Sequence, residues 1–414
     1  MKFGIRTLDD VQLKGKTVLM RVDINQPIDH KTGTLKDTTR VKACVPTIRE
    51  VADQGAKLVL LAHQGSDIEY KNFYTTEPHG KVLSELLGRE VKFIDDVCGP
   101  AAREAIKNLK EGEILLLDNV RYVAEEQTLF ELKLLLSHEE QAKTLLVRKL
   151  APLADFYICD AFAASHRDQP SLCGFEQLLP SAMGRLFEEE FCVISNLMEN
   201  ADRPCVFVLG GAKINDAFMM METVLKGGVA DQVLAGGLVA EVLLWADERD
   251  IGEPAREFIK KQGYADLVDT AKELLAKYRD KLVLPTDFAF VKGGQRQECQ
   301  VGQVPAGELV LDIGSETAEK YRRIIMDAKT VFVNGPMGVF EEAASELGTK
   351  VIWDALGATQ AYTVIGGGDS ITATNKYGKT ELINYICTGG GALIRFLTGE
   401  ELPVVKALRH GSTL

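Results

Sequence analysis

Histidine and arginine side chains follow apolar runs in the first half of the chain, at the points where strands are expected to end. His63 follows LVLLA, Arg121 follows ILLLDNV, and His166 and Arg167 follow FYICDAFAAS. In open α/β sheets, ligands bind at the carboxyl ends of the strands. One histidine in such a place is more often structural than a ligand contact, but several strands that end this way predict an anion-binding site.

The segment TVLMRVDINQP adds further polar groups. Strand alternation places Arg21, Asp23 and Asn25 on one face. An edge strand with one solvent-exposed face explains these polar side chains. On a buried strand such charges are costly, and they then indicate a functional role. Arg40, in KDTTRVKACVPTI, stands at the head of a helix, where a loop from the Asp23 strand returns it to the same edge. Several guanidinium groups together suit a ligand with a carboxylate and a phosphate, because each binds either anion through two hydrogen bonds.

Glycines follow the strands expected in the second half of the chain. In VFVLGGAKIND, Gly210 and Gly211 allow close approach to the backbone, and Lys213 reaches a phosphate near a helix N-terminus. This segment has neither the G-x-x-x-x-G-K-[ST] spacing nor G-x-G-x-x-G. It therefore predicts a phosphate site that is neither a P-loop nor the common dinucleotide fingerprint.

The segments VFVNGPMGVFEE and TVIGGGDSITA each place glycines directly after an apolar strand, with one carboxylate in reach. Asp369 suits a magnesium ion that bridges nucleotide phosphates, and Glu341 suits hydrogen bonds from a ribose. Asp369 also fits a helix N-cap, and the two roles are compatible. Further glycine turns are expected at 235–237 and 388–391. Taken alone, each of these turns more often reflects close packing than anion binding.

The composition limits the partners of the chain. The 414 residues carry a formal net charge of -12, which argues against nucleic acids and anionic membranes because both attract basic surfaces. The eight cysteines lie far apart with no C-x-x-C, which predicts free thiols in a reducing cytoplasm rather than a zinc ribbon or a disulfide framework. No apolar run approaches the roughly 18 residues of a membrane span, and the first residues lack a signal-peptide core.

Apolar β-rich runs alternate with helical patterns, which predicts parallel α/β layers. A length of 414 residues favours two domains. The segment 181–200 has the pattern of one long amphipathic helix, which either joins two domains or crosses within one. A shorter helix is expected at 41–54. The expected strands are 17–24, 57–62, 114–117, 156–158, 206–209, 232–234, 281–284, 330–333 and 362–365.

Nine segments resemble, in order, the signature segments of the phosphoglycerate kinase family. They extend from Arg21 to Ala392 and read RVDINQP, LLAHQG, LLDNVRY, DAFAASHR, LGGAKIND, DIGSET, FVNGPMGVFE, IGGGDS and CTGGGA. Their combination is highly specific, FVNGPMGVFE above all. The stretch after Arg121, with HEEQAKTLLVRKLAPLADFYICDAFAASHRDQPSLCGF, is most similar to the archaeal branch.

The resemblance implies an α/β fold with two Rossmann-like domains, each with a parallel sheet, joined by a long helix and with a cleft between them. The expected parts are an acid-substrate domain at 1–180, an interdomain helix at 181–200 and a nucleotide-binding domain at 201–392, with the tail 393–414 packed back on the first domain. The implied enzyme is a glycolytic and gluconeogenic ATP:3-phospho-D-glycerate 1-phosphotransferase. Its implied partners are 3-phosphoglycerate, ATP or ADP and Mg2+, in a cytoplasmic monomer that binds neither nucleic acid nor membrane.

Matching motifs also carry over the site residues that the resemblance implies. Arg40 and Lys213 are similar to the catalytic groups of the family. The implied contacts to the acid substrate are Asp23, Asn25, Arg40, His63, Arg121 and Arg167. The implied contacts to the nucleotide are Gly211, Lys213, Gly236, Gly237, Asn334, Pro336, Glu341, Gly367, Gly368, Asp369 and Ser370, with Asp369 also holding Mg2+.

Two positions depart from the family pattern. The segment AHQG continues with Ser66 and Asp67 where the family usually has an arginine, which removes an expected phosphate contact. Losing such a charge-assisted contact costs roughly 2 to 3 kcal/mol of binding. Ala217 stands where many members carry a second lysine, four residues after Lys213, so the contact to the inner phosphates of the nucleotide is affected.

The implied reaction needs no general base, because a carboxylate and a nucleotide phosphate are both ionised at neutral pH. Catalysis is expected from alignment and charge neutralisation by Lys213, Arg40, Mg2+ and helix N-termini, with domain closure that expels water. The lost cations motivate two rival hypotheses. One is a kinase for a different acid, and the other is a nucleotide-binding protein with weakened catalysis.

Overall fold

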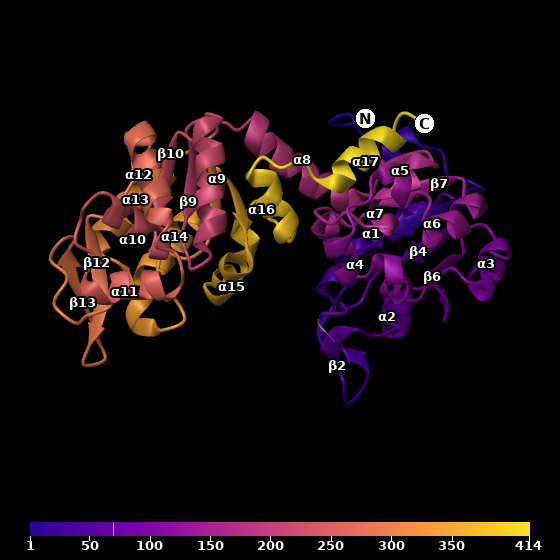
Figure 1. The fold of residues 1–414 in the computed structure, drawn as a ribbon, viewed down its shortest axis with the longest axis horizontal. Helices are drawn as coiled ribbons and strands as arrows, with labels where there is room; N and C mark the ends of the chain where they lie inside the picture. The colour runs from indigo at the N-terminus through magenta and orange to yellow at the C-terminus, as the bar shows by residue number, and fades with distance from the viewer. Residues whose placement is uncertain (69) are drawn as a thin grey trace. The chain divides into compact units, whose positions relative to one another are not determined.

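The computed structural model describes residues 1–68 and 70–414. It divides into two compact units, residues 1–192 with 401–414, and residues 193–400. The chain enters the second unit inside helix α8 (Arg185–Glu199) and returns to the first just before helix α17 (Pro403–Gly411). Each unit has its own parallel sheet and its own core, and Figure 1 shows the elements of each.

The first unit is built on a sheet in which every neighbouring pair of strands is parallel, in the order β5-β6-β4-β1-β7-β8. Val18, Leu19 and Met20 are all buried, so both faces of the central strand are covered. This explains why its strands appear in the sequence as continuous apolar runs. The strands are β1 (Thr17–Arg21), β4 (Lys57–Leu61), β5 (Val91–Ile94), β6 (Ile114–Leu117), β7 (Phe156–Cys159) and β8 (Ser181–Met183).

Helices and a short antiparallel ribbon complete the first unit. The ribbon pairs β2 (Ile28–Asp29) with β3 (Thr34–Leu35). Helix α1 packs its buried side chains into the same core as β1 and β4. The helices before α8 are α1 (Thr39–Asp53), α2 (Glu77–Leu87), α3 (Pro100–Lys107), α4 (Thr128–Lys133), α5 (His138–Gln141), α6 (Leu145–Leu150) and α7 (Pro170–Cys173).

Two of the element predictions need correction here. The strand expected at 17–24 ends at Arg21. The helix expected at 181–200 begins only at Arg185, because residues 181–183 form β8 and pair with β7 in parallel. All three residues of β8 are buried, and Gly184 then turns the chain into the helix with its amide bonded to the carbonyl oxygen of Cys159.

The second unit repeats the parallel pattern in the order β11-β10-β9-β15-β16-β17. Its strands are β9 (Cys205–Leu209), β10 (Gln232–Ala235), β11 (Leu282–Val283), β15 (Thr330–Asn334), β16 (Tyr362–Gly366) and β17 (Tyr385–Ile386). Its helices are α9 (Ile214–Lys226), α10 (Gly237–Ala246), α11 (Glu253–Lys261), α12 (Leu267–Tyr278), α13 (Ser315–Asp327), α14 (Leu347–Ala358), α15 (Gly368–Lys376) and α16 (Gly391–Leu397).

A three-stranded antiparallel sheet, which the sequence patterns did not predict, is added to the second unit. Strand β12 (Asp287–Lys292) pairs with both β13 (Gln295–Gln300) and β14 (Asp312–Ile313). The side chain of Arg296 on β13 donates to the Asp312 carboxylate at 2.8 Å and to the Ile313 carbonyl oxygen at 2.8 Å. This arginine therefore ties the outer strand to the strand on the other side of β12.

Helix α17 belongs to the first unit, where it packs against α7 and β8. Figure 1 shows it in yellow beside the indigo N-terminal segment. The amide of Arg6 donates to the Ser412 hydroxyl at 2.9 Å, and Gly411 approaches so closely that a Cβ there would lie 2.6 Å from Ser181 Oγ. The last residues thus complete a core that the first residues begin.

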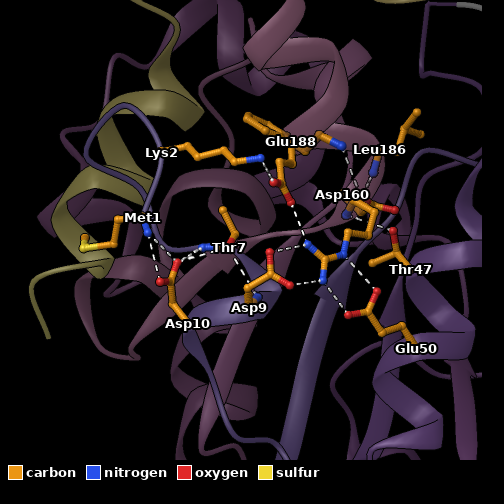
Figure 2. A network of polar contacts seen from close by, with 12 residues as sticks. Met1, Lys2, Thr7, Asp9, Asp10, Thr47, Glu50, Asp160, Leu186 and Glu188 are labelled. Carbon is orange, nitrogen blue, oxygen red and sulfur yellow. Dashed lines mark hydrogen bonds and ion pairs between the residues drawn. The ribbon is translucent and has the colours of Figure 1, made fainter.

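The start of α8 is held in the first unit by a network of charges around Arg185. Its guanidinium group donates to the carboxylates of Asp9, Glu50 and Glu188 at 2.6 to 3.1 Å. Figure 2 shows these three carboxylates converging on one guanidinium group. Hydrogen bonds to Glu50 and then Asp9 raise the pKa of Arg185, so the group stays charged.

All eight cysteines are free thiols. Within the described residues, no helix combines the length and the apolar character that crossing a membrane requires.

Candidate active site

The first unit gathers arginines around His63, at the carboxyl ends of β1 and β4. Arg21 Nη2 lies 3.0 Å from His63 Nδ1, and both side chains are buried. Burial lowers the pKa of His63 well below its usual value. The neighbouring guanidinium groups lower it further, and they belong to Arg121, Arg21, Arg167 and Arg40. The site residues expected on separate strands therefore lie close together, and this group of four arginines and His63 is called the arginine cluster below.

His63 is a neutral hydrogen-bond donor in this cluster. An arginine can only donate, so His63 Nδ1 accepts from Arg21 and the proton of the ring sits on Nε2. A neutral imidazole adds no further positive charge, but its N–H can still bind an anion. The arrangement keeps this donor fixed without a protonation step near neutral pH.

Arg121 carries unused hydrogen-bonding capacity. Its side chain is buried and its Nη1 donates to the carbonyl oxygen of Gly65. Its Nε and Nη2 have no partner among the described residues. Burial, with Arg167 and Arg21 nearby, lowers the pKa of Arg121 to about 10, so it remains charged at neutral pH. Buried donors without acceptors are costly, which indicates a place that an anionic ligand completes.

The other two arginines have carboxylate partners. Arg40 Nη1 donates to Asp23 Oδ2 at 2.9 Å, and Asp23 is almost fully buried. Arg167 Nη1 lies 3.6 Å from Glu131 Oε2. These pairs hold the guanidinium groups in place, and the side chains of Arg40 and Arg167 are 42% and 29% exposed, which leaves surface for a ligand.

The loop after β4 is fixed by contacts from the other strand ends. Asn25 Oδ1 accepts from the Gly65 amide at 2.9 Å, and Gln64 bonds to the backbone of Gln26 on both sides. Gly65 has φ +64°, and a Cβ there would lie 2.1 Å from the carbonyl oxygen of Asn72. Asn25 thus positions the loop that carries His63 and accepts from Arg121.

Ser66 and Asp67, which follow Gly65 at the first departure from the family pattern, have a place in this loop. Ser66 is 8% exposed. Asp67 accepts hydrogen bonds from the amides of Thr128 and Leu129, each at 3.0 Å, and so caps the N-terminus of α4. Helix α4 carries Glu131, the partner of Arg167. Asp67 is therefore linked to the arginine cluster through a helix.

In the second unit, the glycine turns after β9, β10 and β15 bind one another. The amides of Gly211 and Gly237 donate to the carbonyl oxygens of Pro336 and Met337 at 2.8 and 2.9 Å. A Cβ at Gly335, where φ is +92°, would lie 2.1 Å from the carbonyl oxygen of Gly210. The backbone amides of Gly211 and Gly237 are therefore already bonded within the protein. These glycines give close packing of the turns.

A cavity of about 300 Å3 lies beside these turns. Of the residues expected to bind a nucleotide, it is lined by Gly211, Gly237, Pro336, Glu341 and Asp369. The lining does not include Lys213, Gly236, Asn334, Gly367, Gly368 and Ser370. Most of the other walls are apolar and come from Leu238, Phe258, Phe288, Leu309, Val310, Leu311, Met337, Val339 and Phe340. The cavity therefore suits a flat, largely apolar group.

The two charged residues expected to meet the phosphates and Mg2+ are exposed. Lys213 stands at the N-cap position of α9, and Asp369 lies in the first turn of α15. The N-cap of α15 is Gly367, so the alternative reading of Asp369 as an N-cap is wrong. An exposed carboxylate fits Mg2+, which prefers oxygen ligands and keeps several waters.

Two predicted residues support the turns from inside. Ser370 is buried and its hydroxyl accepts from the Gly335 amide at 2.7 Å. Asn334 ends β15 beside Gly367, and its buried Nδ2 has no partner within the described part of the chain. That amide is a donor still open to a ligand.

Residues 8–400 match the family model of phosphoglycerate kinase. The chain belongs to the phosphoglycerate kinase family. As a member of that family, it is an enzyme that transfers a phosphoryl group reversibly between 1,3-bisphosphoglycerate and ADP, giving 3-phosphoglycerate and ATP.

Curated relatives and solved structures agree with this assignment. The chain is 46% identical over 410 residues to the phosphoglycerate kinase of Methanothermobacter thermautotrophicus, covering 99% of this chain and 98% of the relative. It is 44% identical to that of Thermococcus kodakarensis, with 97% and 96% covered. The crystal structure of phosphoglycerate kinase from Pyrococcus horikoshii matches with a TM-score of 0.83 at 42% identity, covering 98% of this chain and 99% of that one. The predicted family, its archaeal branch and the α/β fold are thus confirmed.

Several supporting residues of this phosphoglycerate kinase were not found by sequence reasoning. Glu126 is buried and accepts from the amide and the hydroxyl of Ser171 at 2.5 and 2.8 Å, and Ser171 in turn accepts from Arg21 at 2.9 Å. Burial raises the pKa of Glu126, while Arg21 lowers it. The segment NVRYVAEE offered no periodic signal that would single this glutamate out.

Proposed function

We propose that the arginine cluster binds the acid substrate and that the cavity of the second unit binds the nucleotide. The observation that carries the first assignment is the buried Arg121, with two nitrogens unpartnered in the described structure, beside Arg21, Arg40, Arg167 and neutral His63. Such a set matches a ligand with one carboxylate and one phosphate, as 3-phosphoglycerate has. Asp23 and Asn25 would fix Arg40 and the His63 loop in this site.

For the nucleotide, the apolar walls of the cavity suit a base, and Glu341 at its edge suits a ribose hydroxyl. Asp369 would hold Mg2+ together with the phosphates, and Lys213 would neutralise the phosphoryl group that moves. Bound Mg2+ supplies charge neutralisation between the phosphates. The glycines at 236, 367 and 368 would let the chain approach the nucleotide closely.

The chemistry proposed for these residues is alignment and charge neutralisation. Both reacting oxygens are ionised at neutral pH, so no residue has to remove a proton. Arg40 and Lys213 would stabilise charge on the phosphoryl group during transfer, once both substrates are brought into line. Excluding water at that stage would protect the acyl phosphate from hydrolysis.

We further propose a monomeric enzyme of the cytoplasm. The eight free cysteines suit a reducing compartment. The net charge of -12 gives no support for nucleic acid or anionic membranes as partners.

A coupled assay with Mg2+, ATP and a panel of phosphorylated and unphosphorylated hydroxy acids tests the substrate. We expect a clear preference for 3-phosphoglycerate and turnover of roughly 1 to 100 per second. A preference for another acid would favour the rival acid kinase, and negligible turnover by a folded protein would favour the weakened binding protein.

Two variants separate the two sites. Arg167→Gln should raise KM for 3-phosphoglycerate and leave KM for ATP unchanged, whereas Lys213→Ala should mainly lower kcat. If Arg167→Gln alters only the KM for ATP, the assignment of the arginine cluster to the acid is wrong.

A further inference from the structure

A group of three metal-ligating side chains lies in the first unit and is not used by the proposed reaction. His138, Asp168 and Cys173 each offer one ligand atom, and these atoms lie within 4.8 Å of one another. No other trio of histidine, cysteine, aspartate or glutamate in residues 1–68 and 70–414 meets that condition. They are called the His-Asp-Cys group below.

The short helices α5 and α7 and the loop before α7 bring the three side chains together. His138 begins α5, which Ser137 and Glu140 hold with a capping box, and Cys173 ends α7. The two helices pack against each other. Asp168 lies in the loop before α7, and its Oδ1 is 3.3 Å from His138 Nε2. The positions are therefore set by packed backbone rather than by long flexible side chains.

The ligand types select the class of ion. A thiolate, an imidazole and a carboxylate suit Zn2+ and similar divalent transition metals, whereas Mg2+ and Ca2+ prefer oxygen alone. Zinc binds such ligands at about 2.0 to 2.3 Å, so tetrahedral ligand atoms lie about 3.5 Å apart. The ligand atoms lie up to 4.8 Å apart, so binding of the ion would draw them closer together.

The three residues differ in burial, so a bound ion would be shielded on one side and reachable from solvent on the other. Cys173 is fully buried, and the side chain of His138 is 12% exposed. The side chain of Asp168 is 46% exposed, so an ion can enter from solvent and keep a water as a fourth ligand. An ion pair between His138 and Asp168 accounts for two of these residues, and the Cys173 thiol donates to the carbonyl oxygen of Arg167 over a long distance of 3.9 Å.

A neighbouring amide gives independent support. Gln141 is buried, and its Nε2 donates to Asp168 Oδ1 at 2.5 Å. Its Oε1 is also buried and has no partner within the part of the chain that the structure describes. Gln141 is therefore a buried amide in contact with Asp168 whose hydrogen bonding is incomplete.

We propose that His138, Asp168 and Cys173 bind one divalent transition-metal ion of the zinc class, with water in the fourth position. On binding, the Cys173 thiol releases its proton to solvent and the sulfur forms a bond to the ion. The ion joins α5 to the end of α7 and to the loop that begins at Arg167. The Asp168 amide donates to Glu131 Oε1 at 3.0 Å, and Glu131 is the carboxylate partner of Arg167. The ion is thus a structural clamp beside the arginine cluster and takes no part in phosphoryl transfer.

Cobalt provides a direct probe, because Co2+ bound to a thiolate has a charge-transfer absorption that Zn2+ lacks. The full-length protein, freed of metal with a chelator and kept reduced, is titrated with Co2+ and then with Zn2+. We expect the absorption to saturate at one equivalent and to disappear when Zn2+ displaces Co2+. His138→Asn and Asp168→Asn should each weaken Co2+ binding more than about 10-fold.

Matched variants show which sulfur binds. Cys173→Ser should abolish the absorption, while Cys205→Ser, at another fully buried cysteine, should keep it. The proposal is overturned if the wild-type protein shows no absorption at millimolar Co2+, or if the absorption survives in Cys173→Ser. If Cys173→Ser does not fold, the half-exposed Asp168→Asn decides the question, since unchanged Co2+ affinity in that variant contradicts the site.

Discussion

At the scale of single residues, Arg121 is the side chain whose environment points most directly to a ligand. It is buried, it is charged, and two of its nitrogens find no acceptor among the described residues. A guanidinium group of this kind is stable only if something else compensates its burial. In this phosphoglycerate kinase the backbone oxygen of Gly65 compensates part of the cost of burying Arg121, and the proposed anion would compensate the remainder.

Replacing Arg121 by glutamine should therefore selectively weaken the binding of the acid substrate. One or two charge-assisted hydrogen bonds are worth about 2 to 3 kcal/mol, which corresponds to a drop in kcat/KM for 3-phosphoglycerate of roughly 30- to 150-fold. Steady-state kinetics with each substrate varied in turn measure this. Arg148→Gln, at an exposed arginine of α6, is the matched control and should behave like the wild type. An unchanged KM for 3-phosphoglycerate in Arg121→Gln would contradict the assignment.

Glu241 is a second residue whose burial has a measurable effect, namely on the pH dependence of stability. It lies on α10, lines the cavity of the second unit and is 5% exposed. Burial raises the pKa of Glu241 to about 8. The folded protein therefore holds this proton at pH values where the unfolded chain has lost it, so stability falls as pH rises from the ordinary glutamate value to about 8.

Glu241→Gln should remove that loss, because the amide is neutral at every pH. Each pKa unit corresponds to about 1.4 kcal/mol, so the variant should gain a few kcal/mol over the wild type between pH 5 and pH 9. Urea unfolding without nucleotide measures the difference in the free energy of unfolding. Other buried acids, such as Asp160 and Asp312, cancel in this comparison. Glu253→Gln, at an exposed acid, should show no such trend, and a pH-independent difference for Glu241→Gln would refute the argument.

At the scale of elements, helix α4 links a departure from the family pattern to the site. Asp67 caps this helix and Glu131 on it holds Arg167. Asp67, which follows the position of the missing arginine, thus contributes through helix geometry.

Asp67→Ala should cost about 1 kcal/mol of stability, the usual value of an N-cap, and should also raise KM for 3-phosphoglycerate several-fold. Thermal unfolding and kinetics test both effects. Asp96→Ala is a suitable control, because Asp96 accepts from the amides of Gly99 and Ala102 at 2.9 Å and caps α3 in the same way. It should lose stability and keep its KM. Equal KM values in the two variants would show that α4 does not affect the site.

The same elements show how far the sequence alone can lead. Buried parallel strands such as β4 and β9 are continuous apolar runs, so their positions were predicted within about a residue. Strand β8 lies where the sequence predicts helix, because three residues are too few to display a period. The exposed sequence QRQECQ of β13 has little apolar alternation, since its pairing rests on backbone bonds and on Arg296.

For the site, the sequence predicted a set of charged residues but not the groups that those residues contact. Arg21 ends a strand, His63 and Arg121 follow strands, and parallel topology alone brings strand ends together. The buried Glu126, the cap at Asp67 and the bonded amides of Gly211 and Gly237 depend on loops that are distant in sequence. No local pattern records which carbonyl oxygen a glycine amide will meet.

At the scale of the whole molecule, the first unit is built from both ends of the chain. Val404, Val405, Ala407 and Leu408 of α17 are all buried there. The final segment is therefore part of the core of the first unit, and its loss should affect that unit first.

Leu408→Ala should destabilise the first unit by about 2 to 5 kcal/mol, the usual cost of removing a buried leucine side chain. Differential scanning calorimetry should show the transition of this unit at a lower temperature. Lys406→Ala, at an exposed position of the same helix, should leave it in place. A Leu408→Ala protein that melts like the wild type would show that α17 adds little to the core.

The return of the chain also has a consequence for its synthesis. A ribosome makes residues 193–400 before it makes α17, so every residue of the second unit has been polymerised while the first still lacks its closing helix. Domains generally fold as units during translation, with the N-terminal one first. Here that order is reversed at the final step, and the nascent enzyme can finish its first unit only after helix α17 has left the exit tunnel.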